Sequence, residues 1–146
     1  MSFALLPPLA LLAAAAAPAP APADERPAIA TIGSENMFGG EALFTGRLAV
    51  RDGCLVADFG SGVATPVFDP GVILSPDGKT LHDPAQGSEL PLGRRFSAGS
   101  AWMRDGGTGW TVAEIEAFYG TRIPPGCPTH NVIRLHDFEP PRKELR

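Results

Sequence analysis

Residues 44–59 read FTGRLAVRDGCLVADF, and this stretch decides the fold. Side chains alternate in character along its first half, which is typical of a strand with one buried face. One face carries Phe44, Gly46, Leu48 and Val50, and the other carries Thr45, Arg47, Ala49 and Arg51. Asp52-Gly53 follows, a strong signal for a two-residue turn, because both of its central positions need positive φ. Residues 54–59 are then expected to return as the second strand of a β-hairpin.

Further strands are predicted on the C-terminal side of this hairpin. They are expected at residues 63–68, 72–74, 79–82, 94–103 and 131–136, separated by turn signals rich in Gly, Pro and Asp. Pro66 favours an edge position, or the start of its strand, because proline cannot donate a ladder hydrogen bond. Six or seven short strands at this spacing predict an all-β domain, either a small OB-like barrel or a sandwich.

One short α-helix is expected after residue 110. Thr111 is a suitable N-cap, and Glu114 three residues later completes a capping box. Gly120 is a suitable end signal. We expect this helix to plug an open end of the barrel or to cover an edge.

The N-terminus has the pattern of a secretory signal peptide. Residues 4–17 are apolar and uncharged, and Ala21-Pro22-Ala23 places small residues where a signal peptidase cuts. Residues 1–3 carry no Lys or Arg, so two alternatives are an uncleaved membrane anchor and a disordered Ala/Pro-rich tail. An anchor needs roughly 20 apolar residues, and Pro7-Pro8 interrupts a shorter run. We predict an exported protein, periplasmic or secreted, that meets the membrane only through its signal peptide.

The chain has two cysteines, Cys54 and Cys127. In an oxidising compartment they are expected to form one disulfide. The alternative is a free catalytic or metal-binding thiol. Cys127 lies between Gly126 and Pro128, away from any predicted helix N-terminus that would lower its pKa.

The sequence divides into four parts. We expect a signal peptide at residues 1–23, a flexible linker at 24–41, a β-rich domain at 42–138 and a polar tail at 139–146. The net charge is −4 and no basic cluster is present. Nucleic acid is therefore excluded as a partner, because neutralising phosphates needs a concentrated basic face.

No motif for catalysis, metal or cofactor binding stands out. The three histidines, His82, His130 and His136, lack the spacing of a metal site. Ser61 lies in a Gly-rich turn without the pattern of a nucleophile elbow. The loop at residues 105–109 precedes the predicted helix but lacks the Gly-Lys-Ser/Thr ending of a phosphate-binding loop. We assign no catalytic residue, no metal ligand and no cofactor.

Two tryptophans give the strongest indication of binding. Trp102 and Trp110 flank the loop at residues 105–109, and exposed tryptophans stack on sugars or anchor partners. The alternative is that they fill the end of a small barrel. Arg104 lies between them, and Arg94 and Arg95 precede them, so arginines could rim a site for an anionic ligand or form a solvated strand face. Trp102, Trp110 and Arg104 are the candidate binding residues.

The stretch from Gly46 to Met103 resembles a family of small exported bacterial proteins and lipoproteins of unknown function. The shared pattern is carried by Gly46-Arg47-Leu48-Ala49-Val50, Asp52-Gly53-Cys54-Leu55, Pro66-Val67-Phe68, Pro70-Gly71, Leu92-Gly93 and Cys127-Pro128. The chain departs from the lipoprotein members because it has no cysteine to be lipidated. The resemblance implies an architecture and brings no catalytic residues.

Taken together, these features predict a non-catalytic binding domain of the cell envelope or periplasm. Its partner is expected to be an envelope or extracellular protein, a glycan or a small ligand. One alternative is a small secreted hydrolase that uses His130 or His136 with a serine or cysteine. The other is a structural component of the envelope.

Overall fold

The computed structural model describes residues 26–33 and 42–139. The predicted signal peptide, residues 24–25 and 34–41 of the predicted linker, and residues 140–146 of the predicted tail lie outside the described residues.

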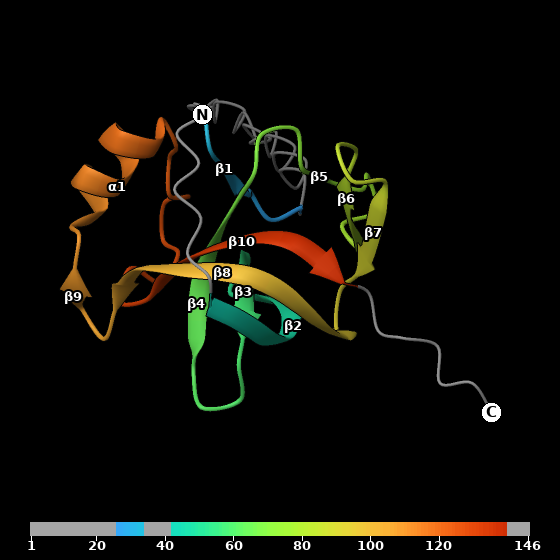
Figure 1. The fold of residues 1–146 in the computed structure, drawn as a ribbon, viewed down its shortest axis with the longest axis horizontal. Helices are drawn as coiled ribbons and strands as arrows, with labels where there is room; N and C mark the ends of the chain where they lie inside the picture. The colour runs from blue at the N-terminus through green and yellow to red at the C-terminus, as the bar shows by residue number, and fades with distance from the viewer. Residues whose placement is uncertain (1–25, 34–41, 140–146) are drawn as a thin grey trace, which may run out of the picture.

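A closed five-stranded barrel forms the body of the domain (Figure 1). Its strands are β2 (Ala42–Arg51), β3 (Cys54–Asp58), β4 (Val63–Phe68), β8 (Arg95–Asp105) and β10 (Val132–Glu139). The order around the barrel is β2, β3, β4, β10, β8 and back to β2. β4 and β10 run parallel, and the other barrel pairs are antiparallel. This closed order, with the third and fifth strands parallel, confirms the predicted OB-like barrel.

β2 bends around the barrel because it changes partner halfway along. Its first half pairs with β8 and its second half with β3, and the two ladders meet at Arg47. Gly46 lies at this bend, where a Cβ would stand only 2.6 Å from Cζ of Phe44 and would overlap the carbonyl oxygen of Asp58. The predicted turn follows, with φ of 51° at Asp52 and 77° at Gly53. Glycine at position 46 thus permits the bend that closes the barrel.

The barrel interior is apolar and rich in aromatic rings. Its largest buried side chains are Phe44, Leu48, Leu55, Phe68, Phe96, Ile133, Leu135 and Phe138. Phe44 and Leu48 are inside as the alternation predicts, whereas Val50 is 46% exposed. Val50 lies near the end of β2, beyond the barrel interior, and it lines a cleft described below.

Pro66 differs from its expected edge position. It is buried in the middle of β4, and β4 has partners on both sides. The Thr65 N–H donates toward the β10 side, to Asn131. The nitrogen of Pro66 therefore faces the other side, where pairing with β3 ends at Ala64. The strand tolerates proline there because no ladder hydrogen bond is needed at that point.

A short N-terminal strand, β1 (Ala30–Thr31), continues that side of β4. It pairs in parallel with Val67 and Phe68, and Ala28 bridges to Cys54. Ala30 is buried in the core. Residues 26–33, a part of the segment predicted to be a flexible linker, are therefore packed against the barrel.

A separate three-stranded antiparallel sheet lies beside the barrel. It consists of β5 (Ile73–Leu74), β6 (Thr80–Asp83) and β7 (Ser88–Pro91), and is called the small sheet below. Leu81 and Leu90 are buried and join the apolar core of the barrel. Figure 1 shows the small sheet and the helix on opposite sides of the barrel.

Helix α1 (Val112–Tyr119) has the predicted caps. Thr111 and Glu114 form the capping box, and Gly120 ends the helix in a left-handed conformation. The buried side of α1 packs in a second apolar cluster against β1, β4, β8 and β10, with members Ala30, Ile32, Val67, Met103, Ile115, Tyr119, Ile123 and Val132. The helix therefore covers an outer face of the barrel and does not plug its end. The short strand β9 (Thr108–Gly109) pairs with the end of β8 just before the helix.

Within residues 26–33 and 42–139, no helix has the length and apolar character needed to cross a membrane.

Candidate functional site

The two cysteines form the predicted disulfide. The Sγ atoms of Cys54 and Cys127 are 2.09 Å apart, and their Cα atoms are 5.5 Å apart. The bond joins the start of β3 to the irregular segment before β10, and it packs with Val56 in a small buried cluster. The cysteines therefore stabilise the fold, and neither is a free thiol.

The two candidate tryptophans belong to different aromatic clusters. Trp102 packs edge-on against Phe59, with ring centroids 5.5 Å apart. Trp110 packs edge-on against Phe118 of α1, with centroids 4.9 Å apart. Each tryptophan is 40% exposed. The sequence placed both beside one loop, but in the structure one ring packs at β3 and the other on the helix.

Arg104 and the loop at residues 105–109 have structural contacts. The Arg104 guanidinium donates to the carbonyl oxygen of Trp110 at 2.9 Å. The N–H of Gly106 donates to Oδ1 of Asn131, and the N–H of Gly107 donates to the carbonyl oxygen of His130. Two loop amides that a phosphate would need are therefore already occupied by the segment before β10.

The three histidines lie in separate parts of the structure. His82 on the small sheet has Nδ1 3.2 Å from a carboxylate oxygen of Glu89. His130 lies beside Gly107, and His136 is on β10. Among the described residues, no three potential metal-ligating side chains come together.

His136 and Asp137 form a hydrogen-bonded pair on β10. Nδ1 of His136 is 2.8 Å from Oδ2 of Asp137, and Gln86 donates to the other carboxylate oxygen. The hydrogen bond from His136, followed by that from Gln86, lowers the pKa of Asp137 below its ordinary value. The imidazole lies over Gly99 with only 16% of its side chain exposed. The pair joins β10 to the turn before β7.

The lowered pKa of Asp137 predicts a loss of stability in acid. A carboxylate with a depressed folded-state pKa stabilises the fold above its unfolded pKa of about 4 and loses that contribution as pH falls through the folded value. The side chain is 68% exposed, so solvent screening reduces the contribution to a fraction of a kcal/mol. We expect Asp137→Asn to weaken the drop in unfolding free energy between neutral pH and about pH 3, measured by urea denaturation. An unchanged pH dependence would contradict this role.

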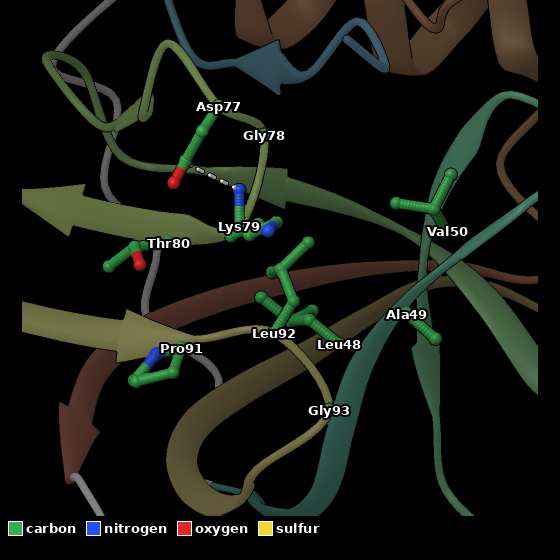
Figure 2. Close-up of a pocket in the computed structure, with 10 residues that line it drawn as sticks. All are labelled: Leu48, Ala49, Val50, Asp77, Gly78, Lys79, Thr80, Pro91, Leu92 and Gly93. Atoms are coloured by element: carbon green, nitrogen blue, oxygen red, sulfur yellow. Dashed lines mark hydrogen bonds between the residues drawn. The ribbon is translucent and has the colours of Figure 1, made fainter. Parts of the chain in front are cut away.

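A shallow, open cleft lies between β2 and the small sheet, and is called the barrel–sheet cleft below (Figure 2). Its volume is about 640 Å³. Three separate segments line it, with residues Leu48, Ala49, Val50, Asp77, Gly78, Lys79, Thr80, Pro91, Leu92 and Gly93. In Figure 2, Leu48 and Leu92 meet at the centre, with Val50 on one side and Thr80 and Pro91 on the other.

Two backbone hydrogen bonds fix the walls of the barrel–sheet cleft. The N–H of Gly93 donates to the carbonyl oxygen of Leu48 at 2.8 Å, which ties the turn after β7 to β2. The N–H of Leu92 donates to the carbonyl oxygen of Lys79 at 2.9 Å, which ties the same turn to the segment before β6. The cleft is therefore held open by the fold itself.

The barrel–sheet cleft presents one carboxylate and one ammonium group at its rim. Asp77 accepts hydrogen bonds from the Ser75 hydroxyl and from the Lys79 N–H, which lower its pKa. The carboxylate of Asp77 therefore stabilises the turn that precedes β6. The Lys79 side chain is exposed, and its ammonium makes no ion pair with any residue in the described ranges. Lys79 thus adds a cation to a largely apolar lining, and its charge also lowers the pKa of Asp77.

Sequence reasoning missed the barrel–sheet cleft because its walls come from segments far apart in the chain. The sequence predicts a turn at residues 75–78 and the start of a short strand at Lys79, and residues 90–93 only as the approach to a later strand. An exposed lysine directly after the Pro76-Asp77-Gly78 turn was a weak signal, because nothing local shows which apolar surface faces it.

No protein-family model, curated protein or solved structure matches the chain. The roles of the residues therefore follow from this structure alone.

Proposed function

We propose that the protein is a non-catalytic binding domain of the cell envelope or periplasm, and that the barrel–sheet cleft is its ligand site. One observation carries the proposal: a cleft of about 640 Å³ combines apolar walls with a single ammonium that has no ion pair within the described residues. Ligand sites have volumes of roughly 300–1,000 Å³, mostly apolar walls and a few polar groups that orient the ligand.

The walls favour a small amphipathic anion. Val50 is 46% exposed, and Leu92 is partly buried at the centre of the cleft. A ligand with an apolar body would remove this surface from water, at about 25 cal/mol per Å². A carboxylate on the same ligand would meet Lys79 and form a charge-assisted hydrogen bond. The proposed ligand class is therefore a medium-chain carboxylic acid with an aliphatic body.

Two features support a location outside the cytoplasm. The first is the apolar, uncharged stretch at residues 4–17 followed by a small-residue cleavage pattern. The second is the Cys54–Cys127 disulfide, since such bonds persist mainly in oxidising compartments.

The test is a titration of isotope-labelled protein with octanoate, followed by NMR. We expect Lys79→Gln to weaken binding about tenfold, because a hydrogen bond to a charged group contributes roughly 1.5–3 kcal/mol. Val50→Asp should abolish binding, since it places a carboxylate against the aliphatic chain. Both positions are exposed enough for the fold to survive.

Arg94→Gln is the matched control, because Arg94 is an exposed cation in the turn after β7 and does not line the cleft. It should bind octanoate like the wild type. Failure of the wild type to bind octanoate, or equal binding by all three variants, would contradict the proposed site.

A second candidate surface is the aromatic side of α1. Trp110 and Phe118 are each 40% exposed and line a shallow hollow of about 450 Å³ with Glu114 and Ala117. Exposed aromatic rings often anchor protein or glycan partners. Trp110→Ala should abolish such binding without unfolding the domain if this surface is the contact. The small hydrolase and the structural envelope component stay predictions.

A further inference from the structure

A polar recess of about 230 Å³ lies at the bend of β2, and is called the arginine recess below. Arg47 and Arg95 line it from β2 and β8, and Phe59 and Gly60 line it from the loop after β3. It shares no lining residue with the barrel–sheet cleft. The recess exists because β2 parts from β8 and joins β3 at this point.

Arg47 and Arg95 are placed directly opposite each other. They are register partners across the antiparallel β2–β8 pair. Such partners have Cβ atoms about 4.5–5.5 Å apart, and like charges in this arrangement are destabilising. Within the described ranges, neither guanidinium has a hydrogen bond or an ion pair. The fold thus holds two positive charges opposite each other, and neither forms an ion pair within the described ranges.

The carboxylate of Asp58 in the recess is paired with a different arginine. Asp58 is the register partner of Arg47 on β3 and also lines the recess. One of its oxygens accepts a hydrogen bond from Arg51 at 2.6 Å, and the other accepts one from the N–H of Gly60 at 2.9 Å. Each oxygen thus has a partner outside the Arg47–Arg95 pair, and the charge of Asp58 is balanced by Arg51. The lining of the recess therefore carries two positive charges and one negative charge, and the negative charge is paired with Arg51 outside the lining.

Hydroxyl groups extend the same face. Thr45 lies two residues before Arg47 on β2, and Ser97 lies two residues after Arg95 on β8, so all four share one face of the sheet. The Thr45 and Ser97 hydroxyls are 3.3 Å apart, and Thr45 lines the recess. The recess therefore combines two planar guanidinium groups with a hydroxyl group that can donate to an anion.

We propose that the arginine recess binds a doubly charged tetrahedral oxyanion, either free phosphate or the phosphate group of a monoester. Two guanidinium groups match two negative charges, and each can donate two parallel hydrogen bonds to such an anion. A bound anion attracts both Arg47 and Arg95, and this attraction offsets the repulsion between the two guanidinium groups. A carboxylate carries a single charge and therefore binds more weakly.

The test is a titration with inorganic phosphate in low-salt buffer, monitored by NMR and by thermal unfolding. We expect phosphate to shift the amide signals around Arg47 and Arg95 and to raise the melting temperature. Arg47→Gln and Arg95→Gln should each weaken phosphate binding at least about tenfold. Arg94 is adjacent to Arg95 in the sequence but lies outside the recess, so Arg94→Gln should change the phosphate affinity less than about twofold. Acetate should bind at least about tenfold more weakly than phosphate.

A second measurement separates binding from folding. In phosphate-free buffer, Arg95→Gln should be at least as stable as the wild type, because it removes a like-charge pair. In millimolar phosphate the wild type should be more stable than Arg95→Gln. A titration with glycerol 3-phosphate then distinguishes a phosphate monoester from free phosphate as the ligand. Tighter binding of glycerol 3-phosphate than of inorganic phosphate identifies a monoester, and equal or weaker binding identifies free phosphate. No response to phosphate, or the same response in Arg47→Gln and Arg95→Gln as in the wild type, would overturn the proposal.

Discussion

Removing the Cys54–Cys127 disulfide should lower the free energy of unfolding by about 4 kcal/mol. The two cysteines are 73 residues apart in the sequence, and closing a loop of that length removes entropy from the unfolded chain by about this amount at 25 °C. The bond also joins β3 to the segment before β10, so its loss frees an irregular stretch. The measurement is urea denaturation of a variant in which both cysteines are serine.

Reduced wild-type protein is the control, because it keeps both sulfur atoms in the cluster with Val56 and loses only the cross-link. We expect it to lose nearly as much stability as the double serine variant. A loss below about 1 kcal/mol in both would contradict the role of the disulfide.

Replacing Gly46 with valine should destabilise the domain by about 3 kcal/mol or more. A Cβ at this position would overlap the carbonyl oxygen of Asp58 and approach the Phe44 ring. The nearest atom belongs to the backbone and cannot rotate away, so the cost falls at the upper end of overpacking penalties. β2 would have to straighten where it passes from β8 to β3. The measurement is again the unfolding free energy in urea.

Leu43→Ala on the same strand is the control for Gly46→Val. Leu43 is 75% exposed, and we expect a change within about 0.5 kcal/mol. A Gly46→Val variant as stable as the wild type would show that the bend of β2 does not require glycine.

Local signals in the sequence predicted much of the fold. The alternation at residues 44–51, the Asp52-Gly53 turn and the capping box of Thr111 and Glu114 each depend on residues that are close together in the chain. The OB-like barrel followed from the number and spacing of the strands. The Cys54–Cys127 bond was predicted because the chain offers a single possible pair.

Features that depend on distant partners were not predictable. The strand character of Ala30 comes from pairing with Val67 on β4, and nothing around Ala30 shows this. Pro66 is tolerated inside β4 because the partner on one side changes there, which only the assembled sheet reveals. The helix covers an outer face of the barrel because its buried side chains, Ile115 and Tyr119, pack there in one cluster with Val67 and Val132.

The candidate site was predicted less well than the fold. Exposure of Trp102 and Trp110 is observed, but their rings pack against Phe59 and Phe118, in different clusters. Arg95 was named as a possible rim of an anion site, whereas its neighbour across the strands, Arg47, could be found only from the register of β2 and β8. Sequence patterns identify candidate residues, and the pairing of the strands determines which of these residues lie close together.

The most direct test of the proposed function is an unbiased screen of small fragments by NMR with the purified protein. We expect anionic fragments with an aliphatic body to shift the amide signals of Val50, Lys79, Thr80 and Gly93, which line the barrel–sheet cleft. We also expect these shifts to be lost in Val50→Asp. Fragments that bind only at Trp110 and Phe118, or no fragment binding in the cleft, would contradict the proposed function.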